Sequence, residues 1–198
     1  MVRALDSLDW RALASTEGVA SNEEPFWSWD SRFLVFSLGG KLKRVDVAGG
    51  PAQALCDFTG GNVRGGFWTR DGKIVFGANN SPLMQVAAGG GVPTPLFRLE
   101  AGELTERNPV LLPDGRHFLY SRASPGTDAN GVFVGSLDAK LDQHGKRLFA
   151  DRFVPHYVPS LEPGGGGGFA GAEEVYAVLC GYVDLAVQGL TQILLLAS

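Results

Sequence analysis

The stretch that decides the fold is PFWSWDSRFLVF, residues 25–36, because the chain repeats it. A close copy, GFWTRDGKIVF, spans residues 66–76, and a looser copy, PVLLPDGRHFLY, spans residues 109–120. Between the first two copies, four aligned pairs lie 41 positions apart: Asp30 and Asp71, Leu42 and Leu83, Val45 and Val86, and Leu55 and Leu96. A repeat of this length is typical of a propeller blade or a helical solenoid.

The composition of each repeat favours the blade. Helical repeats need apolar residues spaced three and four apart, and this spacing is absent. Each unit instead predicts four short strands: one ending at Phe-Trp, a nearly continuous apolar strand, an alternating strand and a last strand after a glycine corner. A continuous apolar strand is expected where both faces of a sheet are covered. The predicted fold class is therefore all-β, with propeller blades formed by four-stranded antiparallel sheets.

The turn between the first two strands has a recognisable chemistry. Gly72 and Gly115 can take a positive φ without steric cost. The preceding Asp71 and Asp114, with Asp30 at the matching position, can accept hydrogen bonds from nearby backbone N–H groups. These five residues are predicted to have a structural role in the turn.

The repeats divide the chain into one propeller segment, residues 1–198. Its predicted parts are a half blade at 1–24, blades at 25–64, 65–107 and 108–156, and a degraded blade at 157–198. Propellers close four to eight blades into a ring. The sequence favours an open segment of a larger ring, and the alternative is a ring closed by pairing of the two termini.

The bulk composition fits a folded, glycine-rich β protein. The 28 glycines follow no Gly-X-Y period, which excludes a collagen-like chain. The formal net charge is −4, so no basic field draws nucleic acid to the chain. The small basic cluster Lys41, Lys43 and Arg44 is predicted on the exposed side of a strand. No nucleic-acid partner is expected.

The sequence carries no pattern for catalysis, a metal or a cofactor. The histidines His117, His144 and His156 have no metal-ligand spacing. Cys56 and Cys180 form no CxxC motif and are expected as buried apolar thiols. The chain also lacks a kinase catalytic loop and a Gly-x-Ser-x-Gly elbow. No catalytic residue, metal site or cofactor is therefore predicted.

The repeats resemble a known family. The stretches PFWSWDSRFLVF…GGKLKRVDVAGG and LLPDGRHFLYS…GVFVGSLD are similar to the WD-like β-propeller repeats of the TolB type. More narrowly, they resemble the propeller that follows the kinase domain in bacterial serine/threonine protein kinases. The resemblance covers residues 1–150 well and 151–198 poorly. It implies a six-bladed or similar propeller that contacts proteins or ligands.

Binding residues are predicted at the end of the segment that carries the first turns. Trp29 replaces a turn residue and can anchor a partner, and Arg70 and Arg116 are expected to cluster with it. Trp27 and Trp68 occupy one repeat position and are expected as structural wedges between blades. The protein or small-ligand partner itself cannot be named from the sequence.

Two functional classes remain open. The first is a non-catalytic propeller that binds a protein or ligand. The second is the accessory propeller of an enzyme, either a serine/threonine kinase or a prolyl-oligopeptidase-like peptidase, and a TolB-like periplasmic scaffold is a further alternative. The compartment stays unknown: cytoplasmic for a complete chain, and periplasmic or extracytoplasmic for a fragment of a membrane-spanning kinase or a TolB-like protein. Membrane contact is expected at most through the apolar tail after residue 174, which Asp184 interrupts.

Overall fold

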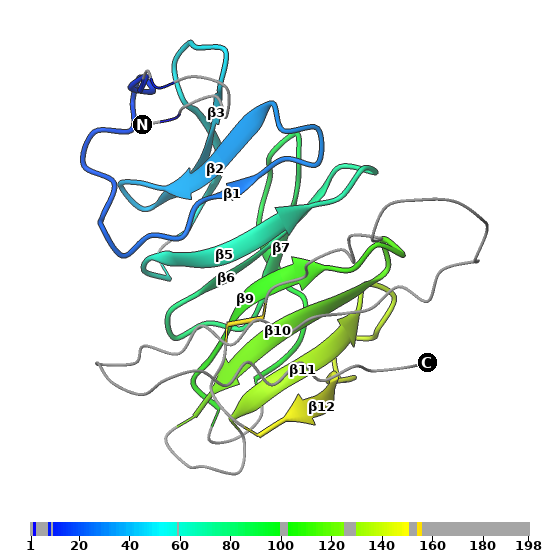
Figure 1. The fold of residues 1–198 in the computed structure, drawn as a ribbon. Coiled ribbons are helices and arrows are strands. Elements are labelled where there is room, and N and C mark those ends of the chain that lie inside the picture. Colours follow the sequence, from blue (N-terminus) through cyan, green and yellow to red (C-terminus); the bar gives the residue numbers. More distant parts are fainter. Residues whose placement is uncertain are drawn as a thin grey trace, which may run out of the picture.

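The computed structural model describes residues 2, 8, 10–58, 60–99, 103–124, 130–150 and 154–155. Within these residues the chain forms twelve β-strands and no helix, and the strands make three four-stranded antiparallel sheets (Figure 1). This confirms the predicted all-β class with four-stranded sheets. Among the same residues, no helix has the length and apolar character needed to cross a bilayer.

Each sheet is an antiparallel meander in which the strands lie side by side in chain order. The first sheet contains β1 (Phe26–Trp27), β2 (Phe33–Ser37), β3 (Lys41–Asp46) and β4 (Gln53–Asp57). The second contains β5 (Val63–Trp68), β6 (Lys73–Ala78), β7 (Met84–Ala87) and β8 (Thr94–Pro95). The third contains β9 (Thr105–Leu111), β10 (His117–Ala123), β11 (Gly131–Ser136) and β12 (Lys146–Phe149).

The three sheets succeed one another as blades do, with their first strands adjacent. β5 contacts both β1 and β9, and β9 also packs against β6 (Figure 1). A parallel bridge joins Glu24, just before β1, to Arg64 in β5. The first strands of neighbouring sheets therefore run in the same direction. All first turns consequently lie at one end of the segment, called here the turn end.

The apolar side chains of the second strands alternate between two inter-sheet cores. Ile74 and Phe76 of β6 belong to the core between the first and second sheets. Val75, between them in sequence, belongs to the core between the second and third sheets. All three side chains have no exposed surface. The continuous apolar run in β6 thus reflects a strand covered on both faces.

Two glycines allow the sheets to approach closely. A Cβ atom on Gly66 would lie 2.4 Å from the ring of Phe26 in the first sheet. A Cβ on Gly77 would lie 2.5 Å from Cα of Arg107 in the third sheet. Side chains at these two positions are excluded by the packing of the neighbouring sheet.

Trp27 and Trp68, which occupy the same repeat position, differ in burial. The prediction that both are structural wedges between blades is therefore wrong for Trp27. Trp68 is buried between the first two sheets and stacks on Phe33, with 5.8 Å between ring centroids. Trp27 is 48% exposed, because it shares with its register partner Leu34 the face of the first sheet that points away from the second sheet. That face is covered in part by Leu13 from the segment before β1.

The prediction that Arg44 lies on an exposed strand face is also wrong. Its guanidinium carbon lies 4.9 Å from the Phe33 ring centroid and 5.8 Å from that of Trp68. Arg44 also donates a 3.2 Å hydrogen bond to the carbonyl oxygen of Ala88, just after β7 of the second sheet. The long side chain therefore bridges two sheets, with its apolar stem and planar head used in packing.

Several predictions concern residues outside the described part of the chain. These are the degraded blade at 157–198, the glycine run at 164–168, His156, Cys180, and residues 1, 3–7 and 9 of the half blade. Cys56 is described, and it is a buried free thiol in the core between the first two sheets.

Candidate functional site

The first turn of each sheet is held by an aspartate. In the first sheet, Ser28 donates from Oγ to Asp30 Oδ1 at 2.6 Å, and the N–H of Arg32 donates to the same oxygen at 3.2 Å. These hydrogen bonds, that from Ser28 foremost, hold the pKa of Asp30 below its ordinary value. Ser31 takes the positive φ (57°) that glycine supplies in the other two turns.

The second and third turns reach the same shape with different donors. The hydroxyl of Thr69 donates to Asp71 Oδ1, and Gly72 has a φ of 84°. Asp114 Oδ1 accepts from the N–H groups of Arg116 and His117, both at 2.9 Å, and Gly115 has a φ of 66°. Burial acts to raise the pKa of Asp114, but these hydrogen bonds outweigh it and leave the pKa lowered.

The turn end brings two of the three predicted binding residues together. Trp29 is 54% exposed, and the guanidinium carbon of Arg70 lies 5.7 Å from its ring centroid. This separation is within the range of a cation–π contact. Because the two residues belong to neighbouring sheets, the pair presents an aromatic ring and a positive charge across the blade boundary.

Arg116, the third predicted residue, has a partner inside its own sheet. Its Nε lies 2.5 Å from Oδ2 of Asp138, which follows β11, and both side chains are 63% exposed. An exposed pair of this kind contributes little to stability. Arg116 is thus available at the surface of the third sheet but is engaged by Asp138 rather than by Trp29.

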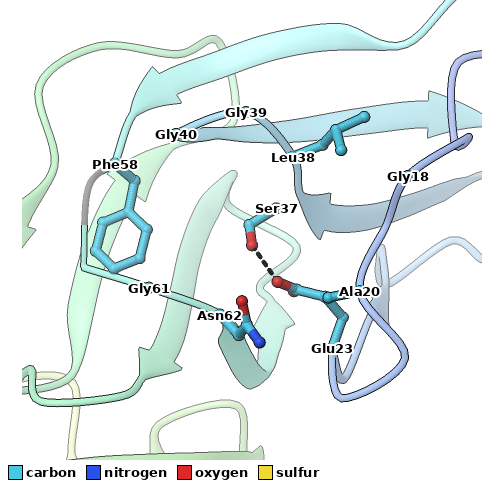
Figure 2. Close-up of a pocket in the computed structure, with 10 residues that line it drawn as sticks. All are labelled: Gly18, Ala20, Glu23, Ser37, Leu38, Gly39, Gly40, Phe58, Gly61 and Asn62. Atoms are coloured by element: carbon cyan, nitrogen blue, oxygen red, sulfur yellow. Dashed lines mark hydrogen bonds between the residues drawn. The ribbon is translucent and has the colours of Figure 1, made fainter.

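A cavity lies at the opposite end of the first sheet. It measures about 260 Å³ and lies beside the end of β2; its lining residues are Gly18, Ala20, Glu23, Ser37, Leu38, Gly39, Gly40, Phe58, Gly61 and Asn62. Figure 2 shows Glu23 and Ser37 facing each other, with Asn62 beside them and Phe58 across the opening. No motif in the sequence predicts this site. Its only local signals are the polar run Asn22–Glu23–Glu24 and the paired glycines of the β2–β3 turn, which are common in loops.

Glu23 is the ionisable group of this cavity. Ser37 Oγ donates to Oε1 at 2.5 Å, and the N–H of Val63 donates to Oε2 at 3.2 Å. Burial raises the pKa of Glu23 above its ordinary value despite these hydrogen bonds. The hydrogen bonds therefore offset only part of the desolvation penalty of the ionised carboxylate.

A second charged cluster is buried in the third sheet. The guanidinium of Arg122 lies 2.6 Å from Glu103 and 3.2 Å from Glu106, and its Nη2 lies 3.1 Å from Nδ1 of His144. Ligand atoms of the two glutamates and the histidine lie within 4.8 Å of one another, a spacing that suits a metal ion. Arg122 already places a positive charge among them, so this cluster serves as a buried ion-pair network.

The sheets and their exposed turns define a propeller-type repeat module. No family model and no curated protein matches the chain. Among solved structures, one assigned to TolB from Agrobacterium tumefaciens is similar at 15% identity with a TM-score of 0.39. The match covers 68% of this chain and 65% of that structure, so the chain spans less than two thirds of its length. The blade arrangement rests on the three sheets themselves.

Proposed function

We infer that this chain is a non-catalytic β-propeller module that binds a protein partner through its turn end. The observation that carries the proposal is the exposed Trp29 ring held against Arg70 across two sheets. Tryptophan and arginine are the side chains most enriched at energetically dominant positions of interfaces. An exposed tryptophan fixed by a neighbouring sheet also loses little conformational freedom on binding.

The rigid turns support the same function. Trp29 and Arg70 each precede a turn aspartate, Asp30 or Asp71, that accepts a hydrogen bond from a side-chain hydroxyl. Binding residues are commonly found on loops positioned by a rigid scaffold. A partner that suits this surface presents an apolar side chain for the ring and a carboxylate for Arg70.

The proposal also includes an accessory role beside an enzyme. The resemblance of the repeats to propellers that follow bacterial kinase domains supports an accessory role beside a serine/threonine kinase. We infer that the chain alone has no turnover, since its sequence has neither kinase motifs nor a hydrolase elbow. Phosphotransfer or peptide cleavage by the purified chain would contradict this.

The test is site-specific photocrosslinking in the native host. A photoreactive amino acid at position 29 is expected to capture a discrete partner, and capture is expected to fall when Arg70→Ala is added. The matched control is position 104, because Leu104 is exposed to a similar extent (48%) but lies at the other end of the segment, before β9. With the partner identified, Trp29→Ala should weaken binding about 10- to 100-fold. Identical adducts from both positions, or less than a twofold loss, would exclude the turn end.

A further inference from the structure

The cavity at the far end of the first sheet has features that the turn-end function does not use. It is bounded by the loop before β1, the β2–β3 turn and the connection from β4 to β5 (Figure 2). Turn residues Gly39 and Gly40 have φ values of 63° and 71° and no side chains to fill the space. A second, more open hollow of about 520 Å³ shares Gly61 and Asn62 with it. A ligand seated at Glu23 therefore has room to extend.

The Glu23 carboxylate retains unused capacity to accept hydrogen bonds. The Ser37 hydroxyl and the Val63 N–H donate to it, and the backbone N–H of Ser37 acts on it as well, whereas an ionised carboxylate offers about four lone-pair sites. Figure 2 shows the carboxylate reaching into the space between Ser37 and Asn62. A further donor arriving from the cavity would thus complete its hydrogen bonding.

The neighbouring cations are engaged elsewhere. Arg64 Nη1 donates to the carbonyl oxygen of Asn22 at 2.9 Å and lies 3.4 Å from Oε1 of Glu24. Lys41 pairs with Asp57 at the surface. Within the described residues, no ion pair to Glu23 is found at 4.0 Å or less. The charge of Arg64 still acts on Glu23 and opposes the rise that burial causes in its pKa. The groups that donate hydrogen bonds directly to the carboxylate are neutral.

The wall opposite the carboxylate is aromatic. Phe58 lines the cavity on the side away from Glu23 (Figure 2), and its largely buried side chain belongs to the core between the first two sheets. Its ring is fixed edge-on against Phe76, with centroids 5.1 Å apart and an interplanar angle of 88°. A carboxylate and an aromatic wall together favour an organic cation, since the carboxylate accepts its N–H groups and the ring contacts its charge and its carbon chain.

From this arrangement we propose that the cavity binds the primary ammonium group of an alkyl amine, with Glu23 as its counter-ion. The ammonium donates to the free lone pairs of the Glu23 carboxylate, and the first carbons of the alkyl chain lie against Phe58. The volume of about 260 Å³ suits a short chain rather than a drug-sized molecule. The same chemistry is available from a free amine or from the side chain of a lysine.

The experiment follows amide chemical shifts of the ¹⁵N-labelled full chain during titration with n-butylammonium chloride. Shifts are expected at Gly39, Gly40 and Gly61, with saturation in the millimolar range. Butan-1-ol, which is similar in size but uncharged, should give no saturable shift. Nα-acetyl-lysine methylamide distinguishes the source, because binding of this probe as well would admit a lysine side chain, whereas binding of n-butylammonium alone would restrict the site to free amines.

The decisive variant is Glu23→Gln, which removes the charge while keeping an acceptor for Ser37 and Val63. Affinity for n-butylammonium should fall about tenfold or more. The control Glu17→Gln makes the same charge change on an exposed residue of the same segment and should bind as the wild type does. In the wild type, affinity should also weaken as the pH falls through the raised pKa of Glu23, a readout that does not require the variant to fold. Equal shifts from butan-1-ol, unchanged affinity in Glu23→Gln, or no saturable shift across the millimolar range would overturn the proposal.

Discussion

Asn108 of the third sheet donates a hydrogen bond from Nδ2 to Oε2 of Glu24, which precedes the first sheet. The side chain passes Gly65 of the second sheet, whose position would place a Cβ atom 3.2 Å from Cα of Asn108. Gly65 and Asn108 both have a positive φ, 73° and 53°, and the register of β5 and of β9 shifts nearby. One polar contact therefore ties the first and third sheets together past the second, through strands that carry β-bulges.

The first prediction is that Gly65→Ala destabilises the fold more than a glycine replacement in an open turn. The alanine would take a strained φ, costing roughly 1–2 kcal/mol, and would also press on Asn108. Gly115→Ala is the matched control, since Gly115 has a φ of 66° but nothing within 4 Å of the added Cβ. Denaturant unfolding measures both variants. Equal losses in unfolding free energy would show that the contact between Gly65 and Asn108 leaves room for a methyl group.

The second prediction concerns the two tryptophans that share a repeat position. Trp68→Ala should cost about 3–5 kcal/mol in unfolding free energy, because it opens a cavity beside Phe33 and Arg44 between two sheets. Trp27→Ala should cost less than about 1 kcal/mol, because half of its surface already faces solvent. Urea midpoints at constant m-value measure the difference. A larger loss for Trp27→Ala would contradict the burial described above.

The sequence predicts this fold through local signals repeated three times. The turn aspartates with their glycines, and the apolar run of β6, are each readable within about ten residues. Trp27 was predicted wrongly because the repeat gives its register but not whether a sheet covers its face. Arg44 was predicted wrongly because strand alternation ignores how far a long side chain reaches toward the next sheet.

The candidate sites also differ in how far the sequence reveals them. Trp29 was noticed because it breaks the turn pattern, and its neighbour Arg70 occupies the equivalent place one repeat later. The Glu23 cavity and the Arg122 cluster join residues from separate loops and strands whose sequences carry no motif. Such sites depend on the relative placement of sheets, which no local pattern specifies.

The third prediction compares a buried ion pair with an exposed one. Arg122→Leu leaves Glu103 and Glu106 buried without their guanidinium, so a loss of about 3–5 kcal/mol in unfolding free energy is expected. Arg116→Leu removes only the exposed pair with Asp138 and should cost less than about 1 kcal/mol. Thermal and chemical unfolding of both variants test the contrast. Similar losses would mean that solvent reaches the Arg122 cluster.

The fourth prediction is a pH dependence that originates at Glu106. Burial is the largest influence on this carboxyl group and raises its pKa, while the N–H of Leu83 and Arg122 act in the opposite direction. The unfolded chain releases this proton near pH 4.5, whereas the folded chain holds it to a higher pH. The folded state therefore binds more protons in between, and the contribution of Glu106 to stability is fully present below pH 4.5 and is lost as the pH rises through the raised pKa.

Glu106→Gln isolates this contribution, because the amide keeps an acceptor for the Leu83 N–H without ionising. The stability of the wild type relative to Glu106→Gln should fall as the pH is raised from 4.5 toward neutrality, and then level off. Asp30 and Asp114 do not interfere, because their pKa values are lowered and their contributions are lost only as the pH falls below about 3.8. Unfolding free energies of the two proteins across pH 4–8 give the difference directly. A difference that stays constant over this range would show that Glu106 ionises in the folded chain as it does in water, and a difference that grows in favour of the wild type would show that folding lowers its pKa.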